Sequence, residues 1–252
     1  MNTVKVRELI IGEGMPKICV PIVENTRDGI LKIAKEIVNS SADMVEWRVD
    51  WFETVFDMEE VGRVATELRQ ILGGLPLLVT FRTKAEGGGR EITSDQYKKL
   101  LLDIAANPSV DMVDVEVFFD NEVAQLIRDL KERGVIVVAS NHDFEKTPSQ
   151  EEIIRRLCYM QDIGADILKM AVMPKEQSDV VRLMDATKEM ASKYAKQPVI
   201  TMSMSEMGIV SRLEGQLFGS SVTFGALKKT SAPGQMNVEK LKKRLEKVNN
   251  LV

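Results

Sequence analysis

Short apolar runs alternate with longer amphipathic runs along almost the whole chain, and this alternation constrains the fold more than any other feature. The apolar runs have the composition of buried strands, and the amphipathic runs have the periodicity of helices. The predicted strands cover residues 17–23, 43–49, 76–82, 110–118, 134–141, 166–172, 198–204 and 221–227. Because helix-length segments separate them, we expect these strands to pair in parallel.

Eight predicted strands favour a closed (β/α)₈ TIM barrel over an open doubly wound sheet. No glycine-rich nucleotide-binding motif follows the first strand, which also argues against the open sheet. The helices are predicted over residues 26–40, 58–72, 93–107, 120–134, 147–164, 175–195 and 237–252, with a shorter one around 208–213. We expect residues 1–252 to form a single catalytic domain.

Local signals place several element ends. Thr26, Thr93 and Asp120 are predicted N-caps, and Gly134 and Gly164 are predicted to end helices. Residues 4–16, VKVRELIIGEGMP, predict an N-terminal β-hairpin joined near its two glycines. We expect this hairpin to close the bottom of the barrel.

The composition favours a small-molecule partner. The net charge is −4, and acidic and basic residues are interspersed, which argues against nucleic acid or an anionic membrane as the main partner. Cys19 and Cys158 lack the companions of a metal or redox site, so we expect free thiols and no bound metal. No apolar run approaches the roughly 20 residues of a membrane span, and the N-terminus lacks a signal-peptide core. A cytoplasmic location is expected.

Polar side chains occur near the ends of several predicted strands, where barrel enzymes build their active sites. Since side chains alternate along a strand, Glu46 and Arg48 share one face, while Val45, Trp47 and Val49 face the helices. The polar residues collected at the strand ends are Glu46, Arg48, Arg82, Glu86, Asp114, Glu116 and His142, the only histidine of the chain.

Lys169 is the most informative residue, because it lies inside the sixth predicted strand between Leu168 and Met170. A lysine is rarely buried without a partner, and a closed barrel has no edge strand to expose it. Desolvation and neighbouring arginines are expected to lower its pKa from about 10.4 and free the amine for Schiff-base formation. His142, one strand away, would carry the protons.

The later part of the chain adds binding groups but leaves alternatives open. Arg212 suits a carboxylate, and Ser231 and Gln235 follow the last strand. The candidate residues taken together leave two alternatives open. One is a class I aldolase, which also forms an imine on a barrel lysine, and the other is a non-catalytic metabolite-binding barrel. The absence of a recognisable phosphate loop disfavours the aldolase, and the presence of both Lys169 and His142 disfavours a protein that only binds.

The ordered set of motifs resembles the type I 3-dehydroquinate dehydratase family over nearly the whole chain. The motifs are IGEGMPKICVPI, EWRVD, TFRT with EGG, SNHDF with TP, ADILKMAVMP, TMSM, SRLEGQLFGS and SAPGQ. The resemblance implies a (β/α)₈ barrel, usually a homodimer, that uses no metal or organic cofactor and acts in the shikimate pathway. Pro21 departs from some family members, which have a serine there.

The resemblance also implies a role for each candidate residue. Lys169 would form an imine with the C3 ketone of 3-dehydroquinate, and His142 would take the C2 proton and assist departure of the C1 hydroxyl as water. Glu86 would orient His142, and hydrolysis of the imine would release 3-dehydroshikimate. Arg212 would bind the carboxylate, and the ring hydroxyls and carboxylate would be held by Glu46, Arg48, Arg82, Ser231 and Gln235.

The segment FGALKKTSAPGQM, residues 224–236, has the composition of a hinged loop. We predict that it is open in the free enzyme and closes over the imine, since its contacts to a ligand must offset the entropy of ordering it. Limited proteolysis at Lys228 and Lys229 should therefore slow in a borohydride-trapped intermediate. Equal cleavage rates in the free and trapped enzyme would contradict the closure.

Overall fold

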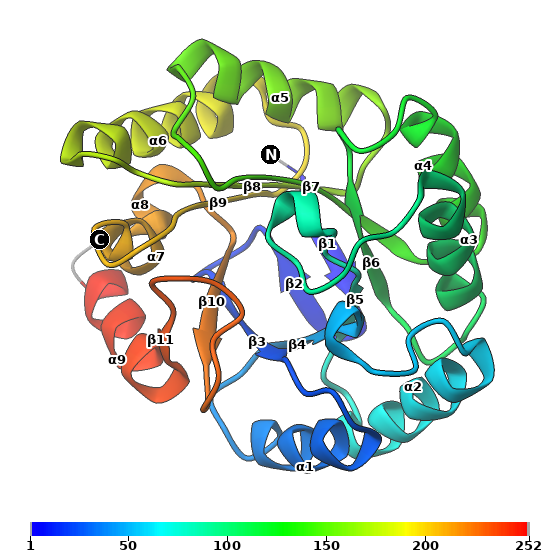
Figure 1. The fold of residues 1–252 in the computed structure, drawn as a ribbon. Helices are drawn as coiled ribbons and strands as arrows, with labels where there is room; N and C mark the ends of the chain where they lie inside the picture. Colours follow the sequence, from blue (N-terminus) through cyan, green and yellow to red (C-terminus); the bar gives the residue numbers. More distant parts are fainter. Residues whose placement is uncertain (1, 251–252) are drawn as a thin grey trace.

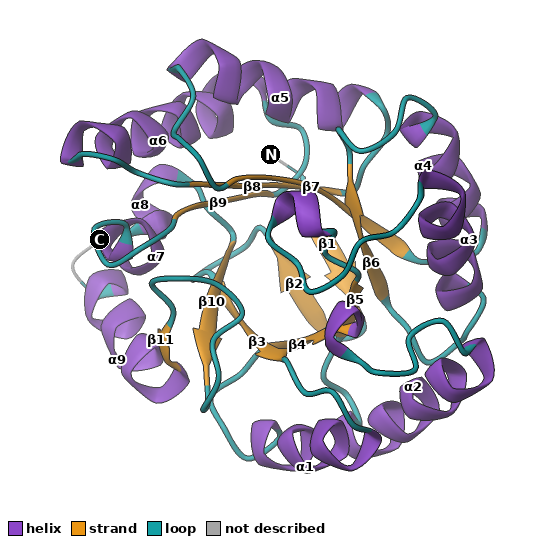
Figure 2. Ribbon diagram, in the orientation of Figure 1, coloured by secondary structure: helices purple, strands orange, loops and turns teal. Residues whose placement is uncertain are grey.

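A curled parallel sheet forms the centre of the molecule, and helices cover its outer face (Figure 1, Figure 2). The computed structural model describes residues 2–250. The eight predicted strands are present as β3 (Lys17–Ile22), β4 (Met44–Arg48), β5 (Leu77–Thr80), β6 (Met112–Glu116), β7 (Ile136–Asp143), β8 (Ile167–Val172), β9 (Val199–Ser203) and β10 (Val222–Ala226). The helices are α1 (Arg27–Ile37), α2 (Met58–Leu72), α3 (Ser94–Ala105), α4 (Val123–Glu132), α5 (Gln150–Asp162), α6 (Gln177–Glu189), α7 (Ile209–Leu213), α8 (Gly215–Phe218) and α9 (Val238–Asn249).

The sheet curls back on itself in a TIM-barrel-like arrangement. Its order is β11-β10-β3-β4-β5-β6-β7-β8-β9, with every neighbouring pair parallel. Strand β9 meets the start of β10 through a parallel bridge between Val199 and Ser220, and the Ser221 N–H donates to the Val199 carbonyl at 2.8 Å. The short strand β11 (Met236–Asn237), beside β10, was not predicted from the sequence.

The predicted N-terminal hairpin is present, but its turn lies elsewhere. Strands β1 (Val4–Val6) and β2 (Leu9–Ile11) pair antiparallel, so the turn is at residues 7–8 and not near Gly12 and Gly14. Arg7 adopts a left-handed φ of 53° there, and its Nε donates to Asp111 at 2.7 Å, which holds this less common conformation in place. The two glycines instead connect β2 to β3.

Two of the three predicted N-caps are confirmed. Thr26 accepts from the Gly29 N–H, and Thr93 forms a reciprocal capping box with Gln96. The prediction for Asp120 is wrong, because α4 starts later, with Glu122 at its N-cap.

The predicted glycine ends of two helices are confirmed by their backbone conformation. Gly134 and Gly164 have φ values of 83° and 93°, the left-handed region that a side chain disfavours. Beyond α6, residues Met190–Tyr194 form a π-helical turn, which accounts for the longer helix predicted from the sequence.

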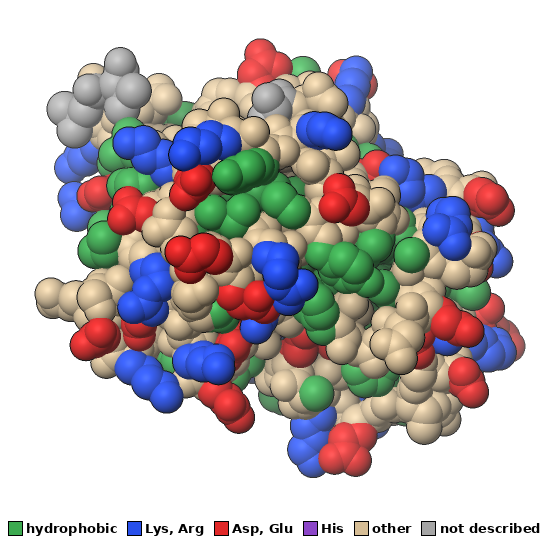
Figure 3. Space-filling model, turned by 90° about the horizontal axis from the view of Figure 1, so that it is seen from above, with side chains coloured by type: hydrophobic (Ala, Val, Ile, Leu, Met, Phe, Trp, Pro, Cys, Tyr) green, Lys and Arg blue, Asp and Glu red, His purple; other side chains and the backbone are tan. Residues whose placement is uncertain are grey.

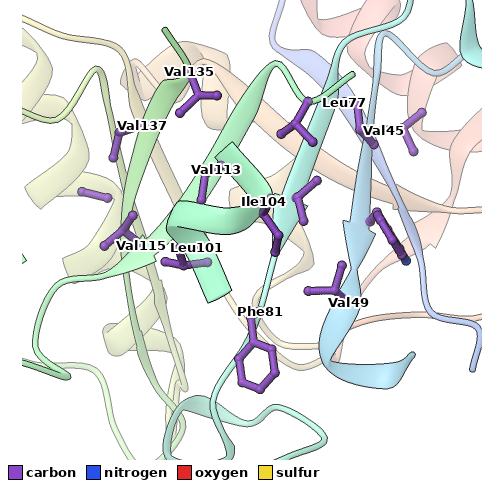
Figure 4. Packing of buried hydrophobic residues seen from close by; sticks show 14 of the residues in the cluster. Val45, Val49, Leu77, Phe81, Leu101, Ile104, Val113, Val115, Val135 and Val137 are labelled. Carbon is purple, nitrogen blue, oxygen red and sulfur yellow. The ribbon is translucent and has the colours of Figure 1, made fainter. Parts of the chain in front are cut away.

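Apolar side chains fill the space between the sheet and its helices. Val45 of β4, Leu77 of β5 and Val113 of β6 pack with Leu101 and Ile104 of α3 in one cluster (Figure 4). Trp47 and Val49 belong to the same cluster, which confirms the predicted outward face of β4.

The interior of the barrel changes from apolar to charged along the strands. Near their N-terminal ends, β4, β6 and β8 place buried Met44, Met112 and Ile167 in a second cluster, which also contains Val6 and Ile11 of the hairpin. Two residues further along the same strands, on the same face, the side chains are those of Glu46, Asp114 and Lys169. The alternation therefore gathers buried charges toward the C-terminal ends of the strands.

The outer surface carries both signs of charge. On the face seen in Figure 3, lysine and arginine side chains are interspersed with aspartate and glutamate. Within residues 2–250, no helix is long and apolar enough to cross a membrane.

Candidate active site

One cavity at the C-terminal ends of the strands gathers most of the predicted site residues. Every residue to which the family resemblance gives a role, except Arg212, lines it, although these residues come from five separate segments of the chain. Asp114 and Glu116 lie outside its lining. Its full lining consists of Glu46, Arg48, Arg82, Glu86, Gly87, His142, Phe144, Lys169, Ala171, Met202, Met204, Phe224, Ser231, Ala232 and Gln235.

Arg82 lies at the centre of a buried ionic network. Its Nη1 donates to Glu116 and its Nη2 donates to Asp114, both at 2.8 Å. The Ser140 hydroxyl donates to Asp114 at 2.6 Å. Burial alone would lower the pKa of Arg82 and raise that of Asp114, but the paired charges outweigh burial and shift both pKa values the other way. Both groups are therefore held in their charged forms.

Lys169 is 3% exposed, and carboxylates are its ionic partners. Its Nζ lies 3.1 Å from an Asp114 oxygen and 3.7 Å from a Glu46 oxygen, and it stands 4.9 Å from the ring centroid of Phe224. The expectation that arginines crowd the amine is wrong for its nearest charges.

Arg48 is held by a residue that the sequence analysis did not select. Asp50 accepts from its Nε and Nη2, both at 2.8 Å, and also accepts from the Gly89 N–H at 3.0 Å. Asp50 was quoted within the motif EWRVD and lies just beyond a strand, but it was not selected. This carboxylate fixes Arg48 and the glycine loop that follows Arg82.

Close packing restricts two of the three glycines that follow Glu86, Gly87 and Gly88. A Cβ at Gly88 would lie 1.8 Å from the Arg82 carbonyl oxygen, and one at Gly87 would lie 2.4 Å from the Phe144 ring. Neither position has room for a side chain. The backbone is thus packed closely where Glu86 enters the cavity.

His142 forms a tight pair with Glu86. The Glu86 Oε2 lies 2.8 Å from the imidazole Nδ1 and accepts the His142 backbone N–H at 2.9 Å, while Oε1 accepts the Asn141 amide at 2.9 Å. This leaves Nε2 as the ring nitrogen available to a ligand in the cavity. Asn141, which holds the other side of the carboxylate, was quoted within a sequence motif but was not selected.

The pair titrates away from ordinary values. Burial and the neighbouring Glu116 carboxylate raise the pKa of Glu86 to about 8. Burial and the charges of Arg82 and Lys169 lower the pKa of His142 well below 6.5. His142 therefore does not titrate near the ordinary histidine value, and the proton lost near pH 8 belongs to the pair.

Arg212 is buried next to the cavity and has no acidic partner among residues 2–250. Its Nη1 lies 3.5 Å from the Met202 sulfur, its Nη2 donates to the Pro233 carbonyl at 3.0 Å, and its Nε has no partner. Burial lowers its pKa to about 10. A desolvated guanidinium with an unused donor is suited to an anionic ligand.

The loop after β10 is tethered over the cavity. Gln235 bonds both the backbone N–H and the hydroxyl of Ser231 at 2.9 Å, and the Ser231 carbonyl accepts from Arg48 at 3.4 Å. At its outer end, Lys229 bonds Glu24 at 2.7 Å. The two predicted loop residues thus reach the site together.

Comparisons with known proteins identify the family. Residues 18–251 match the family model described as type I 3-dehydroquinase. A 3-dehydroquinate dehydratase from Clostridioides difficile is 49% identical over 94% of each chain, and another from Clostridium novyi is 46% identical over 100% of each chain. The chain belongs to the type I 3-dehydroquinase family, and it is an enzyme of that type.

Solved structures agree in fold. The crystal structure of type I 3-dehydroquinate dehydratase from Clostridium difficile with covalent modified comenic acid has a TM-score of 0.97 at 47% identity, covering 100% of this chain and 99% of that one. 3-Dehydroquinate dehydratase from Geobacillus kaustophilus has a TM-score of 0.96 at 36% identity, with 99% and 97% covered. The enzyme thus removes water from 3-dehydroquinate, a step of the shikimate pathway.

We predict that kcat/KM of the enzyme rises with pH through a value near 8, because Nε2 becomes a free base only when the Glu86–His142 pair loses its proton. In Glu86→Gln the carboxyl group is gone, and the remaining cations keep the pKa of His142 below 6.5. The rise should move to that lower range. Rate profiles from below pH 6.5 to above pH 8 test this, and a rise near pH 8 that survives in the variant would contradict it.

Replacement of Arg212 should weaken substrate capture. Loss of one partner of a buried charge pair costs about 2–5 kcal/mol, and lysine cannot reproduce the forked geometry of arginine. Arg212→Lys should raise KM about tenfold or more, measured in steady-state kinetics. Arg128→Lys, on the exposed side of α4, is the matched control and should leave KM unchanged. An unchanged KM in Arg212→Lys would place this residue outside the binding site.

Proposed function

We propose that the dehydration proceeds through an imine between Lys169 and the C3 ketone of 3-dehydroquinate. The neutral amine attacks the carbonyl carbon, and loss of water gives the imine. Removal of a C2 proton and departure of the C1 hydroxyl as water follow, and hydrolysis of the imine releases 3-dehydroshikimate and restores the amine. The net change is the loss of one water molecule.

One observation carries this proposal. The buried amine of Lys169 and the only histidine of the chain line the same cavity from the neighbouring strands β8 and β7. Covalent catalysis by an amine needs a proton carrier within reach, and His142 supplies it. The C. difficile relative is described with covalent modified comenic acid, which supports a nucleophilic group in the family.

His142 is assigned the proton transfers because Asp114, the carboxylate nearest to the Lys169 amine, is a poor proton acceptor. The pKa of Asp114, next to Lys169, is lowered by Arg82 and Lys169 despite burial, so this carboxylate is a weak base. The Glu86–His142 pair instead loses a proton near pH 8 and regains it below, which suits a group that acts first as base and then as acid. Glu86 holds the imidazole through Nδ1.

The remaining polar groups are assigned to substrate binding. Arg212 would pair with the substrate carboxylate, since its own charge is otherwise uncompensated. Glu46, Arg48, Arg82, Ser231 and Gln235 would contact the ring hydroxyls or carboxylate. Both Nη atoms of Arg82 already donate hydrogen bonds to Glu116 and Asp114, so the main role assigned to Arg82 is to hold these two acids in place.

Further proposals concern the molecule as a whole. Val6 and Ile11 are buried with inward residues from the N-terminal ends of the strands, which supports a hairpin that closes the bottom of a (β/α)₈ barrel. We also propose a single catalytic domain over residues 1–252, a homodimer and a cytoplasmic location. The last two rest on the family resemblance and on the sequence.

Borohydride added during turnover should reduce the imine and leave a permanent adduct on Lys169, visible by peptide mass. Lys169→Ala should take no label and lose nearly all activity. Lys175→Ala is the matched control, because Lys175 is exposed on the segment that follows β8, and this variant should label normally. An adduct on any other lysine would refute the assignment of the nucleophile.

Borohydride reduction can also distinguish imine formation with the substrate from the later proton transfer. His142→Ala should still form some borohydride-reducible adduct but lose about 10²–10⁴-fold in rate, the usual contribution of a positioned proton carrier. Normal turnover by this variant would remove His142 from the mechanism.

A further inference from the structure

We propose that Arg156 and Asn141 are positioning residues that fix which nitrogen of His142 carries the proton. They would act through Glu86, in a chain of hydrogen bonds that runs from helix α5 to the cavity. The inference rests on the acid–base role proposed for His142, and it extends that role to two residues that do not line the cavity.

Arg156 is fixed on three sides. Its Nε donates to Glu152 at 2.7 Å, one helical turn earlier, and its Nη1 donates to the Asn141 Oδ1 at 2.9 Å. The same Nη1 lies 3.7 Å from the Asp143 carboxylate. Its guanidinium lies 5.8 Å from the ring centroid of Phe118, which stacks on Tyr159. The side chain is 20% exposed, so it is partly shielded from solvent. A guanidinium can only donate hydrogen bonds.

That property determines the orientation of the Asn141 amide. Because Oδ1 must face the guanidinium, Nδ2 must face the other way, where it donates to the Glu86 Oε1 at 2.9 Å. If the amide were reversed, its NH₂ group would face the Arg156 N–H, and its oxygen would face the Glu86 carboxylate oxygen, so neither hydrogen bond could form. Arg156 thus forces Asn141 to donate to Glu86.

Glu86 passes this constraint to the imidazole. Its Oε1 accepts from Asn141 and its Oε2 accepts from the His142 backbone N–H at 2.9 Å, and both bonds favour the carboxylate. An ionised Oε2 at 2.8 Å from Nδ1 requires a proton on that nitrogen. The lone pair is then on Nε2, where a base is needed.

The charges around Glu86 shift its pKa in opposite directions, so the hydrogen bond from Asn141 can affect where the Glu86–His142 pair loses its proton. Glu116 and Asp114 on β6 favour a proton on Glu86, whereas Arg82 at the end of β5 favours the carboxylate. Arg82, Lys169 on β8 and Arg48 on β4 favour a neutral imidazole. The Asn141 bond lowers the pKa of Glu86 against burial and the acids. Without Arg156 the amide is free to turn, and Glu86 should keep its proton to higher pH.

The single histidine allows a direct test. Enzyme labelled at the histidine nitrogens should give one imidazole in NMR spectra, and its chemical shifts report the tautomer and the titration of His142 whether or not the enzyme turns over. Above the pH of that titration, we expect the proton on Nδ1 in the unmodified enzyme.

In Arg156→Met the Glu86–His142 pair should lose its proton at higher pH. The acid dissociation constant of the pair should fall about tenfold, which is the effect of one hydrogen bond to a charged group. At neutral pH, kcat should fall by a similar factor with little change in KM, because Arg156 lies outside the cavity. Arg156→Lys keeps a donor and should restore most of the titration. Asn141→Leu should reproduce the effect of Arg156→Met.

Arg155→Met is the matched control. Arg155 neighbours Arg156 on α5 and bonds the same Glu152 at 2.6 Å, but it makes no bond to Asn141. This variant should leave the titration, the tautomer and kcat unchanged.

The outcomes separate this inference from the proposed function. An unchanged tautomer and titration in Arg156→Met would overturn the inference, even if Asn141→Leu proves too unstable to study. A shifted titration with an unchanged rate would instead overturn the proposed role of His142. An equal shift in Arg155→Met would show a general electrostatic effect of α5 and would also overturn the inference.

Discussion

The structure depends on pairing the charges that it places inside the barrel. An ionised group taken from water into a protein interior is costly unless an opposite charge and hydrogen bonds compensate it. Arg82 meets this requirement for Asp114 and Glu116, and Asp114 also faces Lys169. Removal of one member of such a pair costs about 3–5 kcal/mol, so the Lys169 amine depends on the ionic network between the inner faces of the strands.

Arg212 departs from this rule, and the departure has a purpose in the proposed mechanism. Its guanidinium is 3% exposed and touches a sulfur and a carbonyl, but no carboxylate from residues 2–250. The enzyme therefore carries the desolvation cost of one cation in the free state. A bound carboxylate would relieve that cost, so in the proposed mechanism the substrate would supply the partner that residues 2–250 do not.

The sequence predicts the strands and their faces well, because these follow from local periodicity. It predicts ionic partners and pKa values poorly, because these depend on contacts between strands. All eight strands and the two faces of β4 follow from alternation, which is a local property. The ionic partner of Lys169 lies 55 positions away in the chain, at Asp114, and it depends on how β6, β7 and β8 are registered. For the same reason, the pKa of His142 could not be anticipated, because its desolvation and the cations around it come from other strands.

Hydrogen bonding and charge sort the acids of the site into two kinds. Asp114 lies between Arg82 and Lys169, and these cations lower its pKa despite burial, so its charged form is favoured. Glu86 lies 3.5 Å from Arg82 and is opposed by Glu116, and burial raises its pKa to about 8. Two buried carboxylates thus differ in the range where they exchange protons, which is how an active site separates charge stabilisation from proton transfer. The difference in pKa between Asp114 and Glu86 depends on Arg82. Its guanidinium lies 2.8 Å from the β6 acids Asp114 and Glu116 but 3.5 Å from Glu86, which is paired with His142 instead.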